Sequence, residues 1–207
     1  METKVVEWYF IRHGEAAPNE NDRARPLTET GKKEVANSVK EHLQTLNLNI
    51  VAAFHNGRRR AEETVEIALS LLGSQASPVY RQGFDFEVSD YDQAGSTYPE
   101  VLAEVQKQVK AGATETAGLW LSLWKGYKLA VLRGRLEQAI CRESELITAE
   151  SVIPSCSSVV VGSHGCFAEL AAVDPKNCGM LTPGGIIKYT VEVSNGVASI
   201  TSSEILC

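Results

Sequence analysis

Residues 5–14 read Val-Val-Glu-Trp-Tyr-Phe-Ile-Arg-His-Gly, and this stretch decides the fold class. Its first seven residues form an apolar run, rich in β-branched and aromatic side chains, that is typical of a strand buried on both faces. A strand of that kind needs helices above and below the sheet. The stretch therefore predicts an α/β protein in which Arg12 and His13 stand directly after a buried strand.

The rest of the chain alternates strands and helices in agreement with this prediction. Further strands are predicted at residues 50–54, 78–82, 159–161, 187–193 and 198–205. Helices are predicted after residues 27–31, with Val35, Val39, Leu43 and Leu46 at helical spacing, at about 60–72, after a cap at Thr97, and at about 116–145. Residues 83–96 read as an acidic loop, and the Asn195-Gly196 turn predicts a β-hairpin. We expect a three-layer α/β/α sandwich with a mostly parallel sheet and an antiparallel hairpin near the C-terminus.

Length and composition limit the possible classes of protein. At roughly 150 residues per domain, 207 residues predict a single domain over 1–207, with a helical insertion at about 97–150 over the site. Hydrophobic residues make up 43% and charged residues 22%, as in ordinary globular proteins. The net charge of −6 argues against general binding to nucleic acid or an anionic membrane. With no apolar run of about 20 residues and no signal peptide, we expect a cytoplasmic protein.

The five cysteines do not form a recognisable pattern. Their number is odd, they make no C-x-x-C pair, and no histidine stands at zinc-ligand spacing from two of them. Free thiols in a reducing compartment are therefore expected, without a disulfide framework or a metal site. No other cofactor is predicted from the sequence.

Basic side chains follow three predicted strands at the point where each strand ends. Arg12-His13 follows the first strand, residues 58–60 the second, and His164 a later one. In open α/β sheets the ligand crevice lies at the carboxyl ends of the strands, so these groups should converge there. Arginines bind phosphate oxygens with two parallel hydrogen bonds, and a neutral imidazole can attack phosphorus. The residues therefore favour phosphoryl transfer without a metal ion.

Four motifs resemble those of the histidine phosphatase superfamily, also called the phosphoglycerate-mutase-like family. R-H-G-E-x-x-x-N matches residues 12–19, L-T-x-x-G matches 27–31, R-A-x-x-T matches 60–64 and S-H-G matches 163–165. In motif style the chain is most similar to the small phosphohistidine phosphatases. The resemblance covers residues 5–72 and 158–168 and is thin between 83 and 157. One departure is Asn56, where the family often has serine.

The resemblance implies a role for each matched residue. His13 would be the nucleophile, with Arg12, Arg60 and His164 holding the phosphoryl group and Asn19 at the phosphate pocket. Arg58 and Arg59 are expected to be solvated charges at the rim. The family's phosphomonoesterases take their general acid from the stretch after the second arginine. There we choose Glu87, because its apolar neighbours would raise its pKa, over the alternatives Asp85, Asp90 and Asp92.

The predicted function is a metal-independent phosphatase that hydrolyses phosphomonoesters or phosphohistidine through a phosphohistidine on His13. The substrate would be a phosphorylated small molecule or a phosphoprotein. Two alternatives remain open: phosphoglycerate-mutase-type phosphoryl transfer, and a non-catalytic module that binds a phosphorylated ligand on the same fold. Other phosphate and hydrolase chemistries lack their motifs, because the sequence has no P-loop, no cysteine with an arginine six residues later, and no G-x-S-x-G.

Overall fold

The protein is built around one six-stranded sheet, seen in a computed structural model that describes residues 3–85, 98–123, 127–150, 154, 156–164, 167–174 and 178–207. The strands are β1 (Lys4–Arg12), β2 (Ile50–His55), β3 (Pro78–Tyr80), β4 (Cys156–Ser163), β5 (Ile186–Ser194) and β6 (Val197–Ile205), in the order β3-β2-β4-β1-β5-β6. The first four in this order run parallel, and β5 is antiparallel to both β1 and β6. The predicted fold, including the C-terminal hairpin, is confirmed.

Strand β1 lies inside the sheet and is covered on both faces. It pairs with β4 on one side and with β5 on the other. Trp8 and Phe10 point into one core, while Tyr9 and Ile11 point into the second, and all four are almost fully buried. The apolar sequence of residues 8–11 follows from this position, because side chains on both faces of the strand meet a hydrophobic layer.

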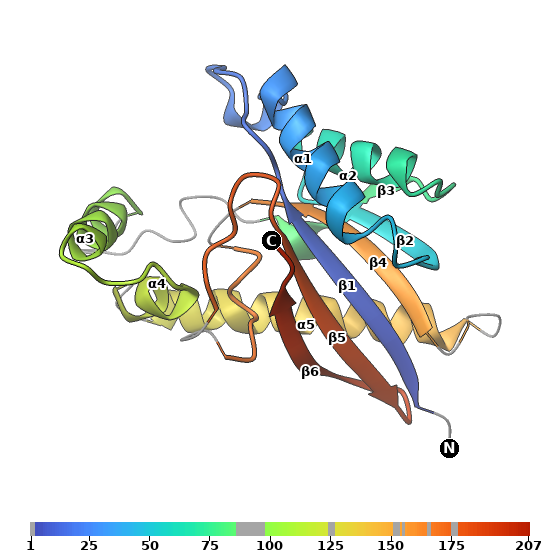
Figure 1. Cartoon of the computed structure of the whole chain (residues 1–207). Coiled ribbons are helices and arrows are strands. Elements are labelled where there is room, and N and C mark those ends of the chain that lie inside the picture. Colours follow the sequence, from blue (N-terminus) through green and yellow to red (C-terminus); the bar gives the residue numbers. More distant parts are fainter. Residues whose placement is uncertain are drawn as a thin grey trace.

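Helices cover both faces of the sheet, as Figure 1 shows. Helices α1 (Glu29–His42) and α2 (Arg59–Leu71) lie together on one face, and the long helix α5 (Tyr127–Ala149) crosses the other. Helices α3 (Tyr98–Lys110) and α4 (Ala117–Leu123) stand at the side of the sheet, at left in Figure 1. The Nε1 of Trp8 donates to the Oγ of Ser144, at 2.9 Å, so the buried indole also ties β1 to α5. No helix in the described parts of the chain is both long and apolar enough to cross a bilayer.

The structure corrects several details of the sequence prediction. The stretch expected as one helix at 116–145 is two helices, α4 and α5, and strand β4 extends well beyond the predicted 159–161. Leu46 is 47% exposed, because α1 ends at His42 and the chain leaves the helix before reaching it. A 3-10 turn, η2 (Gln82–Phe84), begins the expected acidic loop and buries Phe84 in the core. The predicted cap at Thr97 lies outside the described residues.

Two glycines allow the close contacts that bring the motifs together. A Cβ on Gly31, at the start of α1, would lie 2.1 Å from the carbonyl oxygen of Glu15. A Cβ on Gly162, in β4, would lie 2.1 Å from the carbonyl oxygen of Ala61 in the first turn of α2. Only glycine permits backbones to approach this closely. The second contact sets the distance between β4 and the helix end that carries Arg60.

We predict that Gly162→Ala lowers the free energy of unfolding by about 3 kcal/mol, because the added methyl group forces α2 away from the sheet. Thermal and urea denaturation measure the change. The control is Gly134→Ala in α5, where a Cβ meets nothing within 4 Å. Gly134→Ala should raise the free energy of unfolding by up to about 1 kcal/mol, because alanine favours a helix more than glycine does. Equal stability of the two variants would contradict the close contact.

Candidate functional site

The strand ends bring the predicted residues together. Arg12 pairs with Ser163 across the parallel β1–β4 ladder, and the N–H of His13 donates to the carbonyl of Ser163 at 2.9 Å. His13 and His164 therefore leave neighbouring strands at the same edge of the sheet. Arg60 reaches this edge from the first turn of α2, and its Nε lies 3.1 Å from the Nε2 of His13. Arg12, His13, Arg60 and His164 thus form one cluster.

The hydrogen bonds of His13 define its tautomer. Its Nδ1 lies 2.7 Å from the carbonyl oxygen of Gly14, which can only accept, so Nδ1 carries the proton. The Nε2 is then unprotonated, and its electron pair accepts a hydrogen bond from the Nε of Arg60. Burial lowers the pKa of His13 to about 4 against the opposing bond to Gly14, and the charges of Arg60 and Arg12 add to this effect. The imidazole is neutral at pH 7, with its basic nitrogen in the cluster.

The second imidazole is fixed by Asn56. Because the Oδ1 of Asn56 accepts from the N–H of Arg58, its Nδ2 is the atom that faces the Nδ1 of His164, at 2.8 Å. His164 accepts at Nδ1 and therefore carries its proton on Nε2, where it can serve as a donor. Burial lowers the pKa of His164 to about 3, and the neighbouring Arg58, His13 and Arg60 contribute. This second imidazole is also neutral.

Arg12 is held by the segment before β5. Its Nη1 donates to the carbonyl oxygen of Leu181, and its backbone N–H donates to the carbonyl of Gly185 at 2.8 Å. Its Nε is buried and has no hydrogen-bond partner within the described parts of the chain. A buried guanidinium donor without a partner is costly, so this atom suits an anionic ligand.

The guanidinium of Arg60 is paired with Asp22, a residue that the sequence analysis does not predict in the site. This residue opens the 3-10 turn η1 (Asp22–Ala24). The Nη1 of Arg60 donates to its carbonyl oxygen at 2.6 Å, and the Nη2 donates to its Oδ2 at 3.1 Å. Partial burial would raise the pKa of Asp22, but the hydrogen bonds and charges of Arg60 and Arg58 outweigh it and lower the pKa to about 2. Asp22 is therefore ionised at neutral pH.

The expectation for Arg58 is wrong. Its side chain is 4% exposed, and it donates from Nε to the Oδ2 of Asp22 at 3.2 Å and from Nη1 to the Oδ1 of Asp85 at 3.1 Å. Two carboxylates from distant segments compensate the buried charge, which a local pattern cannot reveal. Arg59 behaves as expected: its side chain is 61% exposed and pairs with Glu63.

The remaining predicted residues lie at the edge of the cluster or outside the described chain. Asn19 is exposed, and its Oδ1 accepts from the N–H of Asn21 at 2.9 Å, so it shapes the loop that carries Asp22. Glu87 and its alternatives Asp90 and Asp92 lie outside the described residues. Asp85 is described, and its carboxylate is bound by Arg58, Arg23 and the hydroxyl of Tyr80.

Sequence reasoning missed Asn56, Asp22 and the buried role of Arg58. Asn56 stands where the family often has serine, and its place after a strand and before Arg60 is a usable signal. Asp22 sits in a loop without periodicity, and only its spacing of three residues from Asn19 linked it to a motif.

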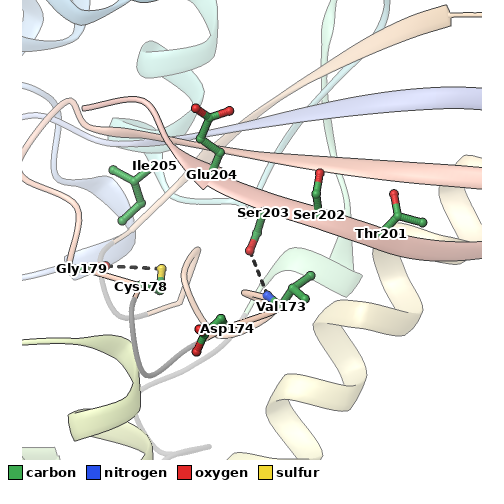
Figure 2. Close-up of a pocket in the computed structure, with 9 residues that line it drawn as sticks. All are labelled: Val173, Asp174, Cys178, Gly179, Thr201, Ser202, Ser203, Glu204 and Ile205. Atoms are coloured by element: carbon green, nitrogen blue, oxygen red, sulfur yellow. Dashed lines mark hydrogen bonds between the residues drawn. The ribbon is translucent and has the colours of Figure 1, made fainter.

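A separate hollow of about 550 Å³ lies between β6 and the segment that follows Val173. Its lining combines hydroxyl groups with two carboxylates, as Figure 2 shows, and the residues are Val173, Asp174, Cys178, Gly179, Thr201, Ser202, Ser203, Glu204 and Ile205. The described residues of this lining carry two carboxylates, Asp174 and Glu204, and no cation. Within the described chain, no group of three or more His, Cys, Asp or Glu side chains could hold a metal ion.

The fold and the cluster together define an α/β protein with two neutral imidazoles and two guanidiniums at the carboxyl edge of its sheet. Residues 8–173 match the sequence profile of the histidine phosphatase superfamily (branch 1). The chain therefore belongs to the histidine phosphatase superfamily. A search of curated proteins gives no match.

Solved structures share the fold at low sequence identity. The phosphoglycerate mutase of Bacillus anthracis str. Sterne superposes with a TM-score of 0.61 at 21% identity, over 97% of this chain and 93% of its own. A mycobacterial glucosyl-3-phosphoglycerate phosphatase gives 0.59 at 14% identity, over 99% and 97%. The protein histidine phosphatase SixA, solved with tungstate, gives 0.52 at 18% identity, over 97% of both chains. These similarities confirm the architecture.

We predict that Asp22→Asn strengthens the binding of inorganic phosphate by about two- to fivefold, because the half-exposed carboxylate competes with an anion for Arg60 and Arg58. Titration calorimetry measures the dissociation constant. The matched control is Glu20→Gln, which removes one negative charge from an exposed position of the same loop and should change the constant by less than about twofold. Weaker binding by Asp22→Asn would mean that Asp22 positions Arg60 for the anion rather than competing with it.

Proposed function

We propose that the protein is a metal-independent phosphatase that transfers the phosphoryl group of its substrate to His13 and then hydrolyses the phosphohistidine. The observation that carries this proposal is the state of His13: a neutral imidazole with Nδ1 fixed on the Gly14 carbonyl and an unprotonated Nε2 that faces Arg60. A weakly basic imidazole that is already deprotonated at neutral pH needs no separate base to become a nucleophile.

In the first step the Nε of Arg60 gives up its hydrogen bond to the Nε2 of His13. The Nε2 then attacks phosphorus, and the bond from phosphorus to the leaving group breaks. Negative charge is then spread over the three oxygens that stay on phosphorus. Arg12 offers its unpartnered Nε to these oxygens, and His164 offers its Nε2–H. Arg60 contributes once it exchanges Asp22 for the phosphoryl group. Preorganised donors of this kind stabilise the transition state because they need not reorient during the reaction.

In the second step water attacks the phosphorus of phosphohistidine, and the phosphorus–Nε2 bond breaks. His13 returns to its neutral form, and inorganic phosphate leaves. If a hydroxyl group of a second molecule takes the place of water, the same intermediate gives mutase activity. Both outcomes share the first step, so the fate of the phosphoryl group distinguishes them.

The leaving group of a phosphomonoester needs a proton, for which we propose Glu87. Its neighbours Phe86 and Val88 are apolar, and such surroundings raise a carboxyl pKa towards neutrality. Asp85 is a poorer candidate, because two arginines hold its carboxylate. Asp22 is poorer still, because its lowered pKa keeps it ionised. We also propose Asn19 as a contact of the substrate at the rim of the pocket.

We predict that the protein becomes phosphorylated on His13 during turnover. Rapid quenching with ³²P-labelled substrate should trap a label that is stable to alkali and lost in acid, because phosphoramidates hydrolyse at low pH. His13→Ala should reduce the label to background, whereas the control His42→Ala, at the half-buried last residue of α1, should keep it. Hydrolysis of p-nitrophenyl phosphate should also be unchanged by EDTA.

Four results would contradict parts of this proposal. A label that persists in His13→Ala would place the intermediate on another residue. Binding of phosphate without any turnover would identify a non-catalytic module, and loss of activity with EDTA would point to a metal. Transfer of the label to an added alcohol in preference to water would favour the mutase alternative.

We predict that Glu87→Gln reduces kcat by at least about tenfold on an alkyl phosphate and by less than about twofold on p-nitrophenyl phosphate, whose phenolate leaves without a proton. Steady-state kinetics on both substrates measure the difference. Asp90→Asn, in the same segment, is the matched control and should leave both rates near those of the wild type. Equal losses on both substrates would remove Glu87 as the acid and favour phosphohistidine as the substrate.

A further inference from the structure

Glu169 is a buried carboxyl group that the proposed mechanism does not use. It lies five residues after His164, and its side chain is completely inaccessible to solvent. Burial raises the pKa of Glu169 to about 7, although a hydrogen bond from Leu181 and the charge of Arg12 act in the opposite direction. Carboxyl groups are rarely fully buried unless a partner compensates them.

One peptide unit connects Glu169 to Arg12. The N–H of Leu181 donates to the Oε1 of Glu169 at 2.8 Å, and the carbonyl oxygen of the same residue accepts from the Nη1 of Arg12. Leu181 is itself buried, so water does not compete for either bond. The carboxylate thereby fixes the position of the carbonyl that holds the guanidinium.

The residues at the two ends of this hydrogen-bonded connection, Glu169 and Arg12, each carry one further buried polar atom. The Oε2 of Glu169 and the Nε of Arg12 are both buried, and neither has a hydrogen-bond partner among the residues that the structure describes. The guanidinium is thus anchored at Nη1 and has an unsatisfied donor at Nε. A phosphoryl oxygen that bonds to this donor would meet a side chain whose orientation is already set.

We propose that Glu169 is the positioning residue for Arg12, and that through the peptide of Leu181 it sets the affinity of the site for the phosphoryl group. The inference rests on the assignment of Arg12 to phosphate binding in the proposed function. Glu169 does not touch the substrate. It acts by preventing the guanidinium of Arg12 from turning away from the cluster.

The test compares three variants by titration calorimetry with inorganic phosphate and by steady-state kinetics. Glu169→Leu removes the acceptor for the Leu181 N–H and should weaken phosphate binding by about tenfold, with a matching rise in KM. Glu169→Gln keeps an acceptor oxygen at the same place and should stay within about threefold of the wild type. If Glu169→Leu does not fold, Glu169→Asp replaces it, because the shorter side chain keeps the charge but withdraws the acceptor.

The matched control is Tyr189→Phe. The hydroxyl of Tyr189 donates to the carbonyl of Ala168, the residue before Glu169, and the side chain is equally buried. This variant loosens the same segment without touching the connection to Arg12. It should lower the melting temperature and leave phosphate affinity unchanged. In an Arg12→Ala background, the addition of Glu169→Leu should weaken phosphate binding by less than about twofold, because the two changes remove one interaction.

The outcomes separate this inference from the proposed function. Wild-type phosphate affinity in folded Glu169→Leu or Glu169→Asp would overturn the positioning role alone. Equal weakening by Tyr189→Phe would also overturn it, because a general loss of packing would then explain the effect. Failure of the wild type to bind phosphate would overturn the proposed function and this inference together.

Discussion

The hydrogen bond from the Nε of Arg60 to the Nε2 of His13 is the contact on which the cluster depends. It forms only when the imidazole is neutral, because a protonated Nε2 would repel the guanidinium. Burial among arginines keeps His13 neutral, since a second positive charge in a low-dielectric environment costs more than it gains. The close approach of α2 to β4 at Gly162 is what brings Arg60 within reach. The backbone packing thereby controls the protonation of the side chain.

A chain of net negative charge buries a group of arginines by pairing them with carboxylates. Arg58 and Arg60 share the carboxylate of Asp22, and Asp85 also pairs with Arg58. The cost of burying two guanidiniums is offset by carboxylates from two different loops. Asp85 is nearly buried, whereas the side chain of Asp22 is 52% exposed. Of the two, Asp22 is the one that an incoming anion can displace with the smaller rearrangement.

Buried residues that follow β4 support the side chain of Arg12. Glu169 lies in the core and accepts from the N–H of Leu181, whose carbonyl accepts from Arg12. Val173, which lines the hollow next to β6, donates its N–H to the Oγ of Ser203 (Figure 2). The contacts of Glu169 and Leu181 therefore extend from the core to Arg12 at the end of β1.

The sequence by itself determined the architecture and the four residues of the cluster, because local sequence patterns specify both. The apolar run of β1 and the Asn195-Gly196 turn specify their elements through residues close in the chain. Arg12, His13, Arg60 and His164 follow strands or open helices within short motifs. For Glu87, the local pattern supplies a hypothesis and nothing more.

Only the tertiary structure decided how these groups are held. Asp22 and Arg58 are 36 residues apart, Asn56 and His164 are 108 apart, and Arg12 and Leu181 are 169 apart. No periodicity links such pairs, so Arg58 reads as a solvated charge and Asn56 as a departure from a motif until the chain is folded. The burial of Arg58 and Asn56 follows from packing around the sheet. The neutral state of both imidazoles has the same origin, because desolvation depends on neighbours that are distant in sequence.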